Sequence, residues 1–176
     1  MDINEKNFPE IIELEEKKCF EFFWNEVSLK EESFGLIRDN SMNPDMASIA
    51  SVGFGLGAIV TGVHRKWITW DEGEERAYKT LHTMRAKVNT VHGFYYHFLE
   101  MSSTKRYHKC ELSIIDTAIF LMGALCAGQY FKGRVREEFE TIYERVDWDW
   151  YRNKETNQFY MGYDEPAHPG EHHGAW

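Results

Sequence analysis

The stretch KCELSIIDTAIFLMGALCAGQYF, residues 109–131, decides the fold. Its second half is apolar on every side of a helix, a pattern typical of a helix that other helices enclose. Its first turns nevertheless carry Glu111 and Asp116. A buried carboxyl group is costly unless it is paired or hydrogen-bonded, so these two acids need an explanation.

A second enclosed helix is predicted from MASIASVGFGLGAIVTGVHRKW, residues 46–67, with Asp45 as a plausible N-cap. Three other segments, residues 8–27, 69–87 and 132–148, have one apolar stripe each and read as amphipathic helices. Enclosed and amphipathic helices therefore alternate along the chain. This order is expected of two concentric helical layers, so we predict an all-α protein, with an α/α toroid favoured over a plain bundle.

The composition excludes several classes of protein. Of the 176 residues 43% are hydrophobic, which argues against disorder. The net charge is −9 and basic residues do not cluster, so we expect no nucleic-acid partner. The longest strongly apolar run, residues 114–127, is shorter than the ~20 residues of a membrane span, so we expect none.

The cysteines and the N-terminal residues bear on the cellular compartment in which the chain is expected. Cys19, Cys110 and Cys126 are widely spaced, which indicates neither a disulfide framework nor a zinc ribbon. Cys19 and Cys126 have apolar neighbours and are expected to be core thiols. The start MDINEKNF has no apolar signal region. As given, the chain is expected to be cytoplasmic; it would be periplasmic or secreted if a signal peptide has been removed.

Six segments in order carry a family resemblance: CFEFFW, GLIRDN, SIASVGFGLGAIVTGVHRKWIT, HGFYYHF, ELSIIDTAIFLMGAL and VDWDWY. Together they resemble the glycoamylase-like family, whose members include endo-β-1,2-glucanases and domains of cyclic β-1,2-glucan synthases. The likeness runs from about Cys19 to Tyr163. It implies an (α/α)6 toroid with a glycan cleft at one mouth, formed by the starts of inner helices and the loops before them.

The resemblance also implies the extent of the domain. A closed ring of ordinary helices needs roughly twice this length, so residues 1–176 are expected to form a single but partial toroid domain. Within it, residues 151–176 are expected to be irregular or to form a short hairpin at the cleft rim. The family's next acidic motif is expected just beyond Trp176.

Glu111 and Asp116 are the candidate catalytic residues. Glycoside cleavage needs one carboxylic acid to protonate the leaving oxygen and a second carboxylate to activate water or attack the sugar. On one helix, five residues correspond to about 140° of rotation and ~7.5 Å of rise, so one acid should face the mouth and the other a neighbouring helix or the preceding loop. The resemblance aligns Asp116 with an acidic position, and where some relatives have another acid three residues earlier this chain has Ser113. Alternatively, Glu111 simply favours a helix start and Asp116 bonds a neighbouring backbone group.

The candidate substrate-binding residues are polar or aromatic side chains near the predicted mouth. They are Arg38, Asp39, Phe54, Tyr96, His97, Trp150 and Tyr160. Arg38 and Asp39 resemble glycan-contacting positions, although a solvated turn pair fits as well. His97 either donates to a sugar hydroxyl or satisfies a buried backbone group. Trp150 and Tyr160 are candidates for stacking on sugars.

No metal or cofactor is expected. The segment DEPAHPGEHH, residues 164–173, is rich in metal-binding side chains, but its prolines and glycine prevent the helical spacing that would aim two imidazoles at one ion. A His-rich loop at the cleft rim is the simpler interpretation.

The sequence thus favours a carbohydrate-active protein, a glycoside hydrolase acting on a β-glucan or another oligosaccharide or polysaccharide. The alternative is a non-catalytic glycan-binding or helical assembly module, because the chain ends before the expected second carboxylate. A partial toroid would expose the flanks of its inner helices. This apolar surface predicts a homo-oligomer.

Overall fold

The computed structural model describes residues 8–164 and 171–174, which hold five α-helices, seven strands and two 3₁₀ turns. The helices are α1 (Phe8–Asn25), α2 (Ile49–His64), α3 (Trp70–Ala86), α4 (Ile114–Phe131) and α5 (Gly133–Tyr143). The strands are β1 (Met46–Ser48), β2 (Thr90–Val91), β3 (Phe94–Tyr95), β4 (Phe98–Glu100), β5 (Leu112–Ser113), β6 (Gly162–Asp164) and β7 (Glu171–His173). The 3₁₀ turns are η1 (Glu31–Ser33) and η2 (Trp148–Tyr151). The strands have only two or three residues each, so the all-α class is confirmed.

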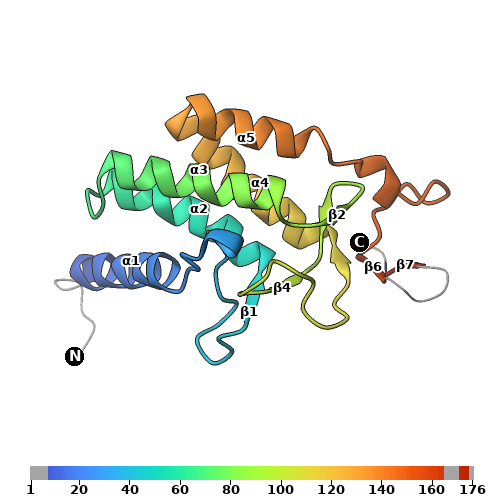
Figure 1. Cartoon of the computed structure of the whole chain (residues 1–176), viewed down its shortest axis with the longest axis horizontal. Coiled ribbons are helices and arrows are strands. Elements are labelled where there is room, and N and C mark those ends of the chain that lie inside the picture. Colours follow the sequence, from blue (N-terminus) through green and yellow to red (C-terminus); the bar gives the residue numbers. More distant parts are fainter. Residues whose placement is uncertain (1–7, 165–170, 175–176) are drawn as a thin grey trace.

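The centre of the fold is the pair α2 and α4, which pack more closely than any other two elements (Figure 1). Two glycines allow this approach. A Cβ atom on Gly53 would lie 2.5 Å from the carbonyl oxygen of Ile119, and one on Gly123 would overlap the carbonyl group of Gly53. Because neither position has a side chain, the two helix backbones touch directly.

The other helices cover this pair. The contacts join α1 and α3 to α2, and α5 to both α3 and α4 (Figure 1). Each covering helix buries part of one face: Phe20 on α1, Ala77, Leu81 and Met84 on α3, and Val135, Phe139 and Ile142 on α5. The predicted alternation of inner and amphipathic outer helices is therefore confirmed.

Hydroxyl side chains cap the starts of α2, α3 and α4. Thr69 caps α3 and forms a capping box with Glu72. Ser48 caps α2, so the prediction that Asp45 would do so is wrong. The reason is that residues 46–48 pair with β4 as strand β1, which moves the helix start three residues along the chain.

Short ladders gather the segments that precede α2 and α4 at one end of the molecule (Figure 1). β1 pairs with β4, and the amide of Ile49 donates to the carbonyl of His97 at 3.1 Å. Tyr96 bridges to Leu112, and β5 continues into the sheet β5–β6–β7. The starts of both inner helices are thus tied to the same loops, in the place where the cleft mouth is predicted.

One prediction about the inner helices is wrong in part, because α4 is not enclosed on every side. Ile115, Met122 and Leu125 are 46%, 59% and 44% exposed, and Cys126 beside them is also exposed instead of being a core thiol. By length and composition α4 is apolar enough to cross a membrane, but 56% of it is buried inside the molecule, as in the core helices of ordinary domains. The exposed residues form one apolar face along α4.

Candidate active site

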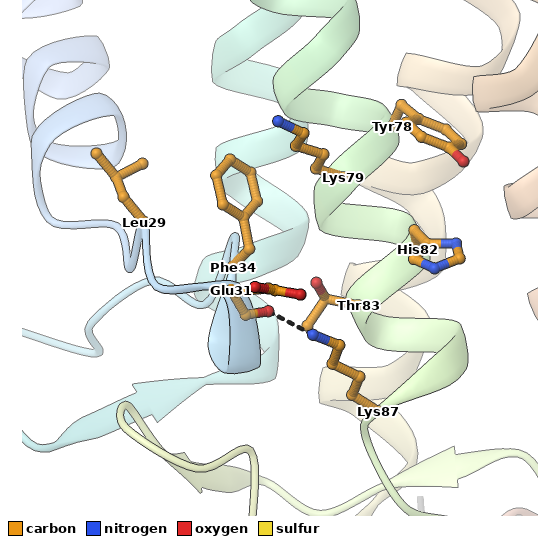
Figure 2. A pocket seen from close by; sticks show the side chains of 8 residues that line it. All are labelled: Leu29, Glu31, Phe34, Tyr78, Lys79, His82, Thr83 and Lys87. Carbon is orange, nitrogen blue, oxygen red and sulfur yellow. Dashed lines mark hydrogen bonds between the residues drawn. The ribbon is translucent and has the colours of Figure 1, made fainter.

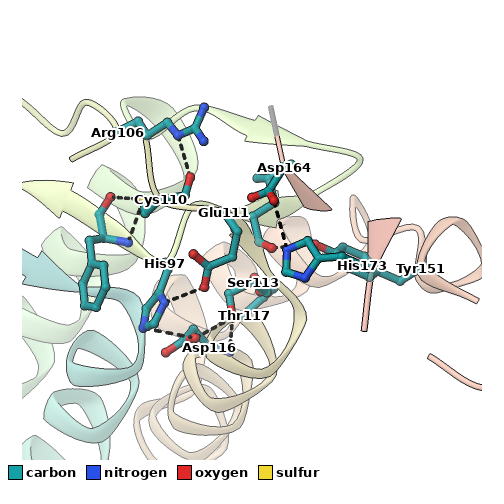
Figure 3. Close-up of polar contacts among 12 residues, drawn as sticks. His97, Arg106, Cys110, Glu111, Ser113, Asp116, Thr117, Tyr151, Asp164 and His173 are labelled. Atoms are coloured by element: carbon teal, nitrogen blue, oxygen red, sulfur yellow. Dashed lines mark hydrogen bonds and ion pairs between the residues drawn. The ribbon is translucent and has the colours of Figure 1, made fainter. Parts of the chain in front are cut away.

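The candidate site is a cluster of two carboxylates around one imidazole at the start of α4 (Figure 3). His97 Nδ1 lies 2.8 Å from Glu111 Oε1, and His97 Nε2 lies 3.6 Å from Asp116 Oδ2. The side chains of His97 and Glu111 are about one third exposed, whereas that of Asp116 is 10% exposed. The three groups converge on the end of the molecule where the two inner helices begin.

Asp116 is held in place by the first turn of α4. Ser113, the N-cap, accepts a hydrogen bond from the Asp116 amide at 3.2 Å and donates its hydroxyl hydrogen to Asp116 Oδ2. Thr117 next to it donates to the carbonyl of Ser113 at 2.7 Å and accepts from the amide of Tyr95 at 3.1 Å. A carboxylate in a helix's first turn is also favoured by the helix dipole. The acid therefore has a fixed orientation before any ligand arrives.

The predicted geometry of the two acids is wrong, because Glu111 is not on the helix. α4 begins only at Ile114, and Leu112–Ser113 is a strand. Extended backbone carries Glu111 away from the helix axis, and its carbonyl accepts from the amide of His97 at 2.9 Å. As a result both carboxylates reach the same imidazole, which two helical positions five residues apart would not do.

A second imidazole–carboxylate pair lies on the other side of Glu111. In the β6–β7 hairpin, His173 Nε2 is 3.5 Å from Asp164 Oδ2. Gly162 lies between: a Cβ atom there would come within 2.9 Å of His173 Nε2 and 3.1 Å of Glu111 Cγ. The hairpin can therefore pack against Glu111 only because residue 162 has no side chain (Figure 3).

Tyr151 is a component of this region that the sequence analysis did not single out. It is fully buried, and its hydroxyl donates to the carbonyl of Leu112 at 2.7 Å. Burial raises the pKa of the Tyr151 hydroxyl, and the negative charges of Glu111 and Asp164 raise it further. The only signal for it was its place at the end of the VDWDWY motif. It fixes Leu112, the residue that follows Glu111, at the start of β5.

The two predicted stacking residues lie in an aromatic cluster beside the hairpin. Trp150 stacks on His92 with ring centroids 4.5 Å apart, and Tyr160 stacks on His172 at 4.7 Å. Burial, with His173 and His92 nearby, lowers the pKa of His172, which favours the neutral ring. Each predicted stacking ring thus already has one face covered by an imidazole, and sugar stacking on the other face stays a prediction.

Arg38 and Asp39 lie on the far side of β1 from His97. Arg38 bridges to Ala47 and forms an ion pair with Glu26, while Asp39 accepts from the side chain of Asn40 at 2.8 Å. The buried Nε of Arg38 has no hydrogen-bond partner among the described residues. The structure therefore does not pair Arg38 with Asp39, and their role in glycan binding stays a prediction.

The remaining two candidates, Phe54 and Tyr96, lie on different segments, the first on α2 and the second between β3 and β4. Phe54 is 51% exposed on the second turn of α2 and packs at an angle against Phe23, with ring centroids 6.4 Å apart. Tyr96 precedes His97 and has the guanidinium of Arg106 over its ring at 4.6 Å. Only Phe54 offers an open apolar ring surface, and its contact with substrate stays a prediction.

The described part of the chain contains no group of three or more His, Cys, Asp or Glu side chains placed to hold a metal ion. Residues 165–170, in the middle of the His-rich segment, lie outside the described residues. A separate cavity of about 540 Å³ opens beside α3 and is lined by residues including Phe34, Tyr78 and His82 (Figure 2). None of the predicted site residues lines it.

The alternation of inner and outer helices defines the class of the fold, a portion of an α/α toroid, and the candidate carboxylate cluster lies at the start of its inner helix α4. Comparisons with known proteins agree with this fold class. The chain is 26% identical over 155 residues to an exo-β-1,2-glucooligosaccharide sophorohydrolase (non-reducing end) of Parabacteroides distasonis, covering 81% of this chain and 21% of that protein. No protein-family model matches the chain.

Two solved structures share the fold. A β-1,2-glucanase from Parabacteroides distasonis superposes with a TM-score of 0.79 at 24% identity, over 94% of this chain and 25% of that chain. An endo-β-1,2-glucanase from Chitinophaga pinensis, complexed with sophorotriose and glucose, superposes with a TM-score of 0.74 at 23% identity, over 90% of this chain and 41% of that chain. The resemblance to glycoamylase-like proteins is thereby confirmed. The chain spans less than half the length of these relatives, so its fold is that of a portion of the toroid.

Proposed function

We propose that this chain carries part of the active site of a glycoside hydrolase that cleaves a β-glucan, with β-1,2-linked glucooligosaccharides as the first substrates to test. The observation that carries the proposal is the convergence of Glu111 and Asp116 on His97 at the start of α4. The sequence match to a sophorohydrolase supports the substrate class.

The chemistry that these groups offer is acid–base glycoside cleavage. Asp116 is nearly buried and oriented by Ser113, so it supplies one fixed carboxylate without needing to reorganise. Glu111 is partly exposed and within reach of an arriving sugar. Glu111 is therefore the candidate for the second carboxylate of the reaction.

The deciding experiment is to incubate the purified chain with α- and β-linked glucans, including β-1,2-glucan, and to separate the products by chromatography. We expect products from one β linkage, and a fall of about 10²-fold or more in Asp116→Asn. Asp71→Asn is the matched control, because Asp71 is also an acid in the first turn of a helix but is exposed on α3. Equal activity of both variants would remove Asp116 from the chemistry.

A second candidate function is a non-catalytic glycan-binding or assembly module. It is favoured by the exposed apolar face of α4 and by the limited share of each relative that the chain covers. Saturable binding of a glucan without any turnover, measured by calorimetry, would support it. In this case we propose that the face of α4 meets a second copy of the chain, and the mass of the particle in solution tests this.

A further inference from the structure

The sheet β5–β6–β7 has one buried face, which is largely aromatic. Leu112, Tyr163 and His172 lie opposite one another on its three strands. Leu112 is fully buried, and the ring of His172 contacts those of Tyr163 and Trp150. Residues that lie opposite one another in a sheet share a face, and the next residue along each strand points to the other face. The next row of residues therefore points away from the aromatic cluster.

The other face of the sheet is polar and adjoins the candidate site. Ser113, Gly162 and His173 form the next row across the three strands. Ser113 holds Asp116 by a hydrogen bond, and Gly162 leaves the middle of the row without a side chain. A Cβ atom at Gly162 would lie 2.9 Å from His173 Nε2 and 3.1 Å from Glu111 Cγ, so these two side chains are neighbours above the glycine. His173 therefore shares the polar face with Glu111 and with the serine that orients Asp116.

The imidazole of His173 is oriented by strand β6. Its Nε2 lies 3.5 Å from Oδ2 of Asp164, two residues beyond Gly162 on that strand (Figure 3). The carbonyl of His173 accepts from the amide of Met161 at 3.0 Å. The side chains of His173 and Asp164 are nevertheless 48% and 53% exposed. The pair is thus held beside Glu111 and remains accessible to a ligand.

The chemistry of this pair suits the hydroxyl groups of a sugar. An imidazole offers hydrogen-bonding nitrogens, and a carboxylate offers two acceptor oxygens. Side by side, His173 and Asp164 can bind two adjacent hydroxyl groups of one sugar ring. An ion pair as exposed as this one contributes little to stability, so folding gives it no evident role.

We propose that His173 is a substrate-binding residue, which bonds a hydroxyl group of the sugar unit beside Glu111 while Asp164 bonds the adjacent hydroxyl. The inference rests on the proposed function, because its ligand is the glucan of that proposal. Its role is recognition and not bond cleavage, since the acid–base groups are Asp116 and Glu111. The pair selects sugars whose adjacent hydroxyl groups match the arrangement of His173 and Asp164.

The test compares two replacements of His173 in the whole chain. His173→Phe keeps a ring over Gly162 but removes both nitrogens, whereas His173→Gln places an amide near the position of Nε2. We expect the KM for a β-1,2-linked glucooligosaccharide to rise about tenfold in His173→Phe with little change in kcat, because a hydrogen bond made equally in the ground state and the transition state is lost. His173→Gln should recover part of this loss.

The control is His64→Ala, because His64 is exposed at the far end of α2. Its KM should equal that of the wild type. Asp164→Ala tests the second contact, and its KM should rise as in His173→Phe. If the chain binds glucan without turnover, the Kd from calorimetry takes the place of KM. Circular dichroism checks that each variant is folded.

The outcomes separate the inference from the proposed function. A wild-type chain that cleaves or binds glucan, with the same KM or Kd in His173→Phe, would overturn the inference and leave the proposed function standing. A loss of the same size in His173→Phe and His173→Gln, or a loss in kcat alone, would also overturn it, because hydrogen bonding to bound substrate would then not be the cause. A wild-type chain that neither binds nor cleaves any glucan would refute both.

Discussion

At the scale of single residues, Ser113 links the start of a helix to a candidate catalytic group. Its hydroxyl accepts from the amide of Asp116 and donates to the carboxylate of the same residue. Where the family resemblance places an acid in some relatives, this chain has a hydroxyl that acts on the neighbouring acid. One side chain therefore serves both the stability of α4 and the orientation of Asp116.

Ser113→Ala should lower the free energy of unfolding by about 1 kcal/mol through the lost cap. It should also reduce glucan turnover, because Asp116 loses the group that orients it. Ser48→Ala is the matched control, since Ser48 caps α2 in the same way and has no catalytic neighbour in its turn. Urea unfolding and product chromatography would measure the two effects. Equal turnover in the two variants would contradict the orienting role of Ser113.

At the scale of elements, the contact between α2 and α4 depends on the absence of side chains. Gly53 and Gly123 lie where the two backbones meet, with no space for even a methyl group. Since the start of α4 carries Asp116, the separation of these helices also sets where the candidate site lies. The contact thus connects the packing of the two helices to the position of the candidate site.

Gly53→Ala should destabilise the fold by about 2 kcal/mol, because the new methyl group meets the backbone of Ile119 and Phe120 and forces the helices apart. Gly57→Ala, on the same helix, should stabilise it by roughly 0.5–1 kcal/mol, since nothing lies within 4 Å of a Cβ atom there and alanine favours helix. Thermal unfolding of the two variants would measure these shifts. Destabilisation of the same size at both positions would mean that helix propensity, and not close packing, decides the effect.

A buried carboxylate, held by two partly exposed side chains, joins the outer helices α3 and α5. Glu138 on α5 is 8% exposed and bonds Arg85 and His82 on α3. Burial disfavours its charge, but the hydrogen bonds from Arg85 and His82 outweigh burial, so the pKa of Glu138 is lowered below its ordinary 4.5. Because the pKa of Glu138 is lower in the folded state than in the unfolded state, its contacts with Arg85 and His82 stabilise the protein at pH values above the unfolded-state pKa. This contribution is lost as the pH falls through the folded-state pKa of Glu138.

Glu138→Gln should therefore cost about 2 kcal/mol at neutral pH and much less in acid. Urea unfolding measured from neutral pH to below 4.5 should show the wild-type and variant curves converging. Glu137→Gln is the control, as the neighbouring residue is exposed on the same helix. A difference between wild type and Glu138→Gln that does not shrink in acid would show that the pair does not act through charge.

At the scale of the whole molecule, the exposed face of α4 is the feature that a closed toroid would cover. Ile115, Met122 and Leu125 follow one another at helical spacing and are each more than 40% exposed. A contiguous apolar face of this kind is rare on the surface of a monomer. It is the surface through which the proposed self-association would occur.

Leu125→Lys should shift the chain from a dimer toward a monomer and leave its helix content unchanged, because the substituted side chain points away from the core. Analytical ultracentrifugation over a range of concentrations would measure the shift. Leu29→Lys provides the control, since Leu29 is 61% exposed in the segment before η1, away from α4. A monomeric wild-type chain at all concentrations would refute self-association through this face.

Much of the fold could be predicted from the sequence, and less of the site. The all-α class and the alternation of inner and outer helices follow from apolar periodicity, which is a local property of each segment. Asp116 could be named as a candidate because it is an acid at the start of an apolar helix. The cap of α2 was misplaced, because the pairing of β1 with β4 is a long-range contact that no local pattern reveals.

By itself, the sequence determined which segments form helices, which of their faces are apolar, and which acids stand near the start of α4. Only the tertiary structure decided that Glu111 leaves the helix, that His97 comes between Glu111 and Asp116, and that Gly162 gives room for the hairpin beside them. The physical reason is the sequence separation of the interacting residues. Helix periodicity depends on residues that are close in the sequence, whereas the site is formed by hydrogen bonds between strands that are far apart in the chain.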